Sequence, residues 1–250
     1  MTGLLERSLD AGALDRLVRL LPAERQRPAR RRLRRLARPV LLGTLRRSAP
    51  VSRRFGYDRG TPIDRYYIER FLEANRAAIR GRVLEVKDST YTDRFGSGVS
   101  ERDVLDADAS NPLATIVDDV TTCATIPDET FDCFILTQTL QYVTELREAV
   151  ATCHRILKPG GTLLVTVPTL GQIVDKPPHL LERWRFAPAG CEELFGSVFG
   201  REAVEVRAHG SCLTSIALLV GMAREELSAE ELERHDPEYA LIVSVKGIKQ

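Results

Sequence analysis

Acidic and polar side chains lie in or directly after four short apolar runs in the middle of the sequence. Glu85 lies in the first run and Asp106 follows the second, where Asp108 is an alternative. The third and fourth runs are followed by further candidates: Asp118 and Asp119, then Thr137, Gln138 and Thr139. Ligands of parallel α/β sheets bind beyond the carboxyl ends of the strands. A single such acid could be a solvated strand end or a helix N-cap, but four strand ends in order favour a ligand site.

The runs that position these residues are short and rich in β-forming residues. They cover 83–86, 103–105, 114–117, 133–136 and 162–167, with helical or mixed stretches between them. Such runs are typical of strands buried on both faces, and intervening helices imply parallel pairing with right-handed crossovers. Two later runs, 203–206 and 241–245, fit an antiparallel edge pair separated by a helical insertion over 211–235. We therefore predict an α/β fold with a doubly wound, mostly parallel, seven-stranded sheet.

A helix is predicted before the first strand. Thr61 can cap it, Pro62 suits its first position, and Gly81 is expected to end it after Ile79. Further upstream, residues 4–21 show helical spacing of leucines, and a second helix is predicted over 28–38. We divide the chain into a helical extension with a linker, 1–50, and a domain over 51–250.

The extension is strongly basic. Thirteen arginines occur between Arg25 and Arg59, with no acidic residue before Asp58. Such a segment could contact a nucleic acid or an anionic membrane. No aromatic residue interrupts the arginines before Phe55, however, so we favour an arm that docks on a protein partner or a second subunit, and nucleic acid is not expected.

The overall composition names no partner. The net charge is +1, and the five cysteines form no CxxC pair, so neither a disulfide framework nor a zinc cluster is predicted and no metal is expected. No apolar run reaches the roughly 18 to 20 residues that span a bilayer. Charged residues also interrupt the N-terminal leucines, which argues against a signal peptide. We expect a soluble cytoplasmic protein.

Three segments resemble the type 11 group of class I S-adenosylmethionine-dependent methyltransferases: GRVLEV at 81–86, IPDETFDCFILTQTLQYV at 126–143 and HRILKPGGTLLVTVP at 154–168. The resemblance implies a Rossmann-like methyltransferase fold that binds S-adenosylmethionine. It implies that Glu85 faces the methionine part, that Asp106 accepts hydrogen bonds from the ribose, and that Asp119 lies by the adenine amine. Asp118, Thr137 and Gln138 complete the implied cofactor site.

The loop after the first strand departs from the family pattern E-x-G-x-G-x-G. Here it contains Lys87, where glycine is usual, and continues as DSTYTDRFG at 88–96. This loop and WRFA at 184–187 resemble a bacterial subgroup often found beside glycosyltransferases. Asp88 and Tyr91 could replace the glycine contacts, the carboxylate by meeting the methionine ammonium and the ring by packing on the sulfonium or adenosine.

Acceptor-side residues are expected on the segment after the fifth strand, a lid over 168–190. His179 is the first candidate for a general base and His209 the second, although either could be a surface or structural histidine. Trp184 and Arg185 offer a stacking face and a donor fork, although Trp184 could simply pack the lid onto the sheet. Arg65 and Tyr66 are further substrate candidates by position.

These observations predict methyl transfer from S-adenosylmethionine to an oxygen, or less readily a nitrogen, of a small metabolite or glycan in a biosynthetic pathway. The alternative is a non-catalytic methyltransferase-like protein that acts as a partner or scaffold in a biosynthetic complex. The missing glycines favour that alternative, and the retained acids oppose it.

Overall fold

The computed structural model describes residues 48–173 and 181–250, together with Val18, Leu20, Pro22, Arg25, Gln26 and Ala29. Internal contacts divide the chain into Met1–Ser48 and Ala49–Gln250. The helices predicted over 4–21 and 28–38 fall almost entirely outside the described residues, and His179 of the predicted lid lies outside them.

The second unit is built on a seven-stranded sheet with the order β3-β2-β1-β4-β5-β7-β6. Strands β1 to β5 pair in parallel, and β7 runs antiparallel between β5 and β6. The doubly wound, mostly parallel sheet with its antiparallel late strands is therefore confirmed. The strands are β1 (Gly81–Val86), β2 (Val99–Asp106), β3 (Ile116–Val117), β4 (Phe131–Thr137), β5 (Leu157–Pro168), β6 (Val204–His209) and β7 (Ile242–Ile248).

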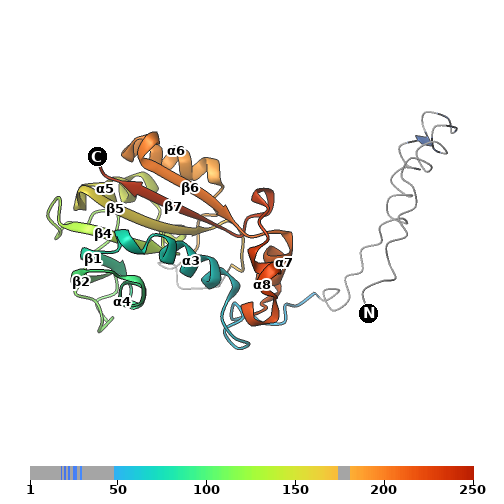
Figure 1. The fold of residues 1–250 in the computed structure, drawn as a ribbon, viewed down its shortest axis with the longest axis horizontal. Coiled ribbons are helices and arrows are strands. Elements are labelled where there is room, and N and C mark those ends of the chain that lie inside the picture. Colours follow the sequence, from blue (N-terminus) through green and yellow to red (C-terminus); the bar gives the residue numbers. More distant parts are fainter. Residues whose placement is uncertain are drawn as a thin grey trace. The chain divides into compact units, whose positions relative to one another are not determined.

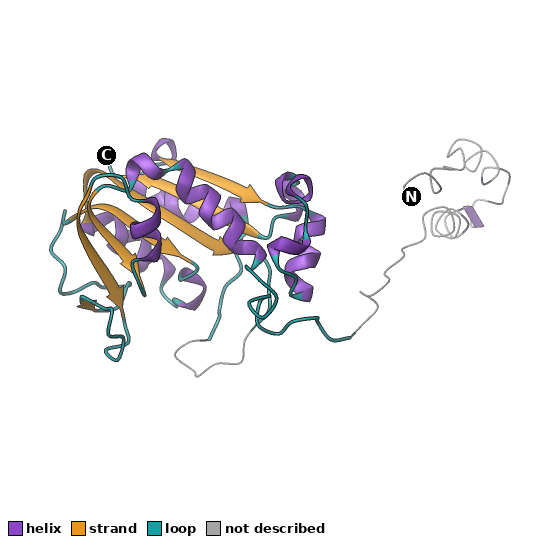
Figure 2. Ribbon diagram, turned by 60° about the horizontal axis from the view of Figure 1, so that its bottom comes forward, coloured by secondary structure: helices purple, strands orange, loops and turns teal. Residues whose placement is uncertain are grey.

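Helices cover both faces of this sheet, as Figure 2 shows. They are α3 (Ile63–Ala74), α4 (Thr90–Phe95), α5 (Leu146–Ile156), α6 (Pro188–Phe199), α7 (Cys212–Val220) and α8 (Ala229–Glu233). Short 3-10 turns occupy Arg76–Ala78, Leu140–Tyr142, Arg201–Ala203, Arg224–Glu226 and Pro237–Tyr239. Helices α7 and α8 form the predicted insertion and lie at the end of the sheet where β7 begins (Figure 1).

Alternate residues of the central strands bury their side chains in two separate cores. In β4, Phe134 and Leu136 pack with α5 and α6, whereas Cys133 and Ile135 pack with α3, α4 and α7. Successive side chains of a strand point to opposite faces, so a strand that is buried on both faces needs apolar residues at every position. This explains why the strand sequences are continuously apolar.

The structure corrects two details of the predicted helix before β1. Helix α3 ends at Ala74, and Gly81 is the first residue of β1, with a φ of 66°. A Cβ at Gly81 would lie 2.4 Å from Asp132 Oδ2, so the close approach of β4 requires glycine there. The helix also begins after Pro62 with no side-chain cap, so the predicted Thr61 cap is wrong.

Candidate active site

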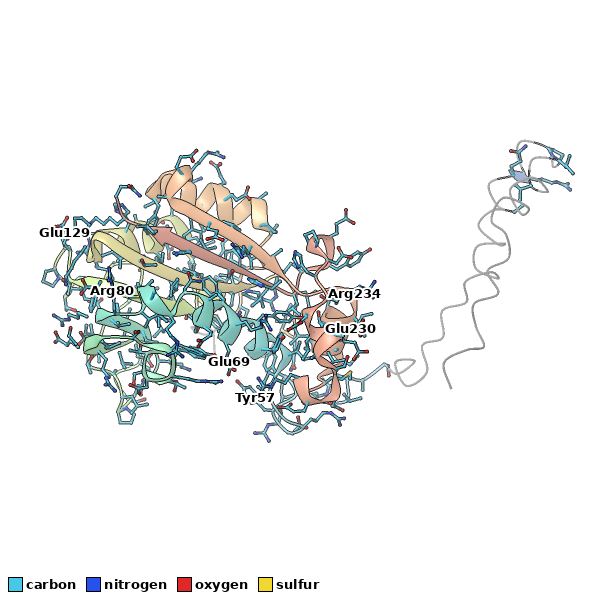
Figure 3. All side chains as sticks on the ribbon, viewed as in Figure 1. Tyr57, Glu69, Arg80, Glu129, Glu230 and Arg234 are labelled. Carbon is cyan, nitrogen blue, oxygen red and sulfur yellow. The ribbon has the colours of Figure 1, made fainter. Side chains whose placement is uncertain are left out.

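A cavity of about 530 Å³ opens at the edge of the sheet where the parallel strands end. Its wall includes the last residues of β1, β2 and β5 and the first residue of β7, with contributions from α3 and the turn at 140–142. Three residues of a later segment also line it: Glu182, Arg183 and Arg185. In Figure 3, Arg80 and Glu129 mark the opposite edge, where β1 and β4 begin, and Tyr57 belongs to the cavity wall. The volume lies in the range of small-molecule sites.

The predicted site residues divide into two groups. Six of them line the cavity: Arg65, Asp106, Asp118, Asp119, Gln138 and Arg185. Seven described ones are not part of its wall: Tyr66, Glu85, Asp88, Tyr91, Thr137, Trp184 and His209. The residues beyond the ends of β2, β3 and β4 therefore come together as the strand order implied.

Glu85 is buried in β1 and faces the protein, not the cavity. Its Oε2 accepts hydrogen bonds from the backbone N–H and the hydroxyl of Thr92, both at 2.7 Å, and its Oε1 accepts one from the N–H of Tyr91 at 3.1 Å. Burial raises the pKa of Glu85 to about 7, although these hydrogen bonds act in the opposite direction. Glu85 thus fastens α4 to β1.

The glycine-poor loop keeps a glycine-like backbone at one position. Lys87 has a φ of 79°, a left-handed conformation that lysine rarely adopts. Its carbonyl accepts a hydrogen bond from Asn111 Nδ2 at 2.8 Å, and its side chain is exposed at the cavity wall. Asp88 Oδ1 accepts a hydrogen bond from the N–H of Thr90 at 2.8 Å, so this carboxylate holds the turn into α4.

Asp106, not Asp108, lines the cavity. Asn111 Nδ2 donates to Asp106 Oδ2 at 2.7 Å, and the N–H of Asp108 donates to Asp106 Oδ1 at 3.0 Å. Asn111 therefore joins the ends of β1 and β2 and fixes the Asp106 carboxylate. The sequence offered no specific signal for this role of Asn111.

The two acids after β3 differ in their contacts. Asp118 Oδ2 accepts hydrogen bonds from the N–H and hydroxyl of Thr125, at 2.8 and 2.7 Å, and its Oδ1 accepts one from the N–H of Asp119. Asp119 Oδ1 accepts hydrogen bonds from Thr121, whereas no described residue donates to its Oδ2. The Asp118 side chain thus holds the loop after β3 together, and Asp119 has one carboxylate oxygen to which no described residue donates.

Helix α3 brings two adjacent charged residues to the cavity. Arg65 Nη1 donates a hydrogen bond to the Tyr91 hydroxyl, and its guanidinium lies 5.6 Å from the centroid of that ring. Asp64 Oδ1 accepts a hydrogen bond from the N–H of Arg65 at 3.0 Å, and burial raises the pKa of Asp64. Tyr91 therefore reaches the cavity through Arg65, and Asp64 is an acid that the sequence analysis missed.

The described part of the predicted lid packs on the turn after β4. The N–H of Arg183 donates to the carbonyl of Gln141 at 2.7 Å, and Trp184 Nε1 donates to the carbonyl of Val143 at 2.7 Å. Arg185 forms an ion pair with Glu182 at 2.6 Å. Trp184 thus anchors this segment, and the Arg185 charge is already paired.

His209 lies at the end of β6, away from the cavity wall. Its Nε2 is 2.7 Å from the Ser244 hydroxyl, and its ring centroid lies 6.1 Å from that of Tyr67. Burial lowers the pKa of His209 to about 4. The ring is therefore neutral near pH 7 and packs between the sheet and α3.

Among the residues that the structure describes, no group of three or more histidine, cysteine, aspartate or glutamate side chains could hold a metal ion. Within the same residues, no helix has the length and apolar character needed to cross a membrane.

Residues 80–165 match the family described as "Methyltransferase domain". Over 39 residues the chain is 51% identical to the ubiquinone/menaquinone biosynthesis C-methyltransferase UbiE of Marinomonas sp. (strain MWYL1). This matched stretch covers 16% of each chain. Over 60 residues it is 38% identical to the protein of that name from Francisella tularensis subsp. novicida (strain U112), 22% of this chain and 24% of that one. The matches thus span less than a quarter of these relatives' length.

Among solved structures, that of the [4+2]-cyclase SpnF resembles the chain in fold. The TM-score is 0.50 with 16% sequence identity, and the similarity covers 80% of this chain and 86% of that one.

Proposed function

We infer that this chain is a class I S-adenosylmethionine-dependent methyltransferase that transfers a methyl group to an oxygen of a small metabolite, sugar or glycan in a cytoplasmic biosynthetic pathway, a proposal supported by the methyltransferase-domain match over residues 80–165. The observation that carries the proposal is the cavity at the strand ends, with Asp106 and Asp119 on its wall. The choice of a sugar or glycan rests on the resemblance of the DSTYTDRFG loop and the WRFA segment.

The hydrogen-bonding groups around the cavity fit S-adenosylmethionine. The Asp106 carboxylate, held in place by Asn111, would accept hydrogen bonds from the ribose hydroxyls, and Asp119 Oδ2 would accept one from the adenine amine. Arg65 is a donor fork for the methionine carboxylate, because its one described side-chain partner is the neutral Tyr91. When bound, this cosubstrate supplies the activated methyl group.

Asp64 is the best-placed proton acceptor among the described residues of the cavity wall. Its carboxylate has no ion pair with the neighbouring guanidinium, and burial raises its pKa above the ordinary value, which makes it a stronger base. We propose that it takes the proton of the acceptor hydroxyl. His179 and His209 stay predictions for this role, with His209 disfavoured because it does not reach the cavity.

The second candidate function is a non-catalytic partner or scaffold in a biosynthetic complex. Lys87 on the cavity wall favours it, since a positive charge there opposes a sulfonium. The fold does not decide between the two, because one fold can carry many different functions.

Transfer is tested with S-adenosylmethionine labelled in its methyl group, incubated with metabolite and glycan extracts. The proposal expects label in one of these fractions with the wild type and with the matched control Asp108→Asn, and a loss of about tenfold or more with Asp106→Asn. Label in neither fraction, or equal labelling by Asp106→Asn, would contradict it.

For the arginine-rich extension we propose docking on a protein partner or a second copy of the chain. Removal of residues 1–50 should then change the oligomeric state or abolish partner binding and leave S-adenosylmethionine affinity unchanged. Binding to nucleic acid that weakens steeply with salt and is lost on this truncation would instead support the nucleic-acid interpretation.

A further inference from the structure

Two residues that line the cavity each contain a buried amide atom with no hydrogen-bond partner among the described residues: Gln138 Nε2 and Gln141 Oε1. Gln141 is only 4% exposed. Buried polar atoms in proteins are almost always paired, and an unpaired one needs an explanation. Because both atoms belong to residues of the cavity wall, a ligand is the natural partner.

The contacts between the two side chains fix which atom of each amide is left over. Gln141 Nε2 donates to the carbonyl of Gln138 at 2.9 Å and lies 3.5 Å from Gln138 Oε1. A flipped Gln141 amide would set two oxygens against each other, so Oε1 is the free atom of Gln141. Gln138 Oε1 is the amide atom that faces Gln141 Nε2, so Nε2 is the free atom of Gln138.

The backbone holds this pair rigidly. Gln138 follows the last residue of β4 with a φ of 49°, and its N–H donates to the carbonyl of Thr166 at 2.8 Å. The carbonyl of Gln141 accepts the hydrogen bond from Arg183 described above. A strained conformation that the surrounding structure maintains is typical of a functional position.

A ligand that satisfies the pair must accept one hydrogen bond and donate one. A carboxylate only accepts, and an ammonium only donates. A neutral amine would use its single lone pair to accept the hydrogen bond from Gln138 Nε2, so no lone pair would remain to attack a methyl group. Before the reaction, a hydroxyl accepts from Gln138 Nε2, donates to Gln141 Oε1 and still keeps one lone pair for the methyl group. Because the Gln141 amide oxygen is not a base, the hydroxyl proton must leave for a base, the role proposed for Asp64, as the new C–O bond forms.

We propose that Gln138 and Gln141 form the recognition pair for a hydroxyl group of the acceptor, which makes the substrate class an alcohol. This inference rests on the proposed methyl transfer and names its acceptor chemistry. It also moves Gln138 from the cofactor site, where the family resemblance put it, to the acceptor side. The position of Gln141 agrees with an acceptor-side role, because its carbonyl accepts a hydrogen bond from the N–H of Arg183 in the lid segment. Asp106 and Asp119, in contrast, line the part of the cavity assigned to adenosine.

The amino-acid head of the cosubstrate is the competing ligand, since its carboxylate accepts and its ammonium donates. Two probes separate the cases: S-adenosylhomocysteine carries that head, and 5′-methylthioadenosine lacks it. The variants are Gln138→Met and Gln141→Met, which keep side-chain length without hydrogen bonding. Gln250→Met, at an exposed position that is not part of the cavity wall, is the matched control.

We expect both variants to bind S-adenosylhomocysteine within about threefold of the wild type and to lose about tenfold or more of the transfer rate. With ¹³C-methyl-labelled S-adenosylmethionine and the extracts above, the wild-type product should carry the signal of an O-methyl group, and Gln250→Met should keep the wild-type rate and affinity. A product methylated on nitrogen or carbon would overturn the inference alone.

Weaker binding of S-adenosylhomocysteine with unchanged binding of 5′-methylthioadenosine would also overturn it, because the pair would then hold the cosubstrate. A wild type that binds the cosubstrate and labels no hydroxyl would count against it as well. Failure of the wild type to bind either probe would instead reject the proposed function itself.

Discussion

Replacing Glu85 by glutamine tests how the altered loop is held to the sheet. The burial of this carboxylate raises its pKa from an ordinary value of 4.5 to about 7. The folded protein therefore holds the proton more tightly than the unfolded chain does. Glu85 contributes stability that is complete below its unfolded pKa and is lost as the pH rises through about 7. The shift corresponds to roughly 3 kcal/mol between the two limits.

Glutamine cannot ionise, so the variant lacks this pH dependence. At pH 5 its amide NH₂ would face the donors of Tyr91 and Thr92, and we expect a loss of about 1 to 3 kcal/mol relative to the wild type. At pH 8 the wild type carries the cost of a buried charge, so the difference should shrink by about 3 kcal/mol and close or reverse.

The assay is urea unfolding of both proteins at pH 5 and pH 8, with Glu230→Gln as a control at an exposed position on α8 (Figure 3). The control should follow the wild type at both pH values. A stability difference between Glu85→Gln and the wild type that stays constant, or grows with pH, would refute the reasoning about burial.

Two further substitutions test the loops around the cavity. Lys87→Gly should raise the free energy of unfolding by about 1 kcal/mol, because glycine adopts the φ of 79° without strain; a lower melting temperature would contradict this. Asp118→Asn should cost about 1 to 2 kcal/mol near pH 7, since the amide cannot accept all the hydrogen bonds from Asp119 and Thr125. Burial acts to raise the pKa of Asp118, but the Thr125 hydrogen bonds outweigh it and the pKa is lowered. The stability from Asp118 is thus present above its unfolded pKa and lost as the pH falls through the folded value, so a cost of Asp118→Asn that does not shrink in acid would count against this account.

Strand positions could be predicted from the sequence because burial on both faces leaves a simple signature. The run at 133–136 is apolar throughout, since Phe134 and Ile135 face different cores. The ends were harder to predict. Helix α3 ends at Ala74, although apolar residues continue to Ile79. Ile79 packs in the same core as the helix, but it does so from the connection after it.

The position of a residue on the cavity wall was predictable where strand order decides it, as for Asp106 and Asp119. It was not predictable where side-chain direction decides the role. Glu85 occupies the expected position but turns into the protein to bind the backbone of α4. Asp64 and Gln141 reach the cavity from a helix and a turn whose packing no short motif encodes.

Cosubstrate binding is the central claim, and calorimetric titration with S-adenosylmethionine tests it most directly. The account predicts micromolar affinity for the wild type and for Asp108→Ala, and loss of binding for Asp106→Ala, whose carboxylate faces the cavity. Absence of binding to the wild type at millimolar cosubstrate, or equal binding by Asp106→Ala, would contradict it.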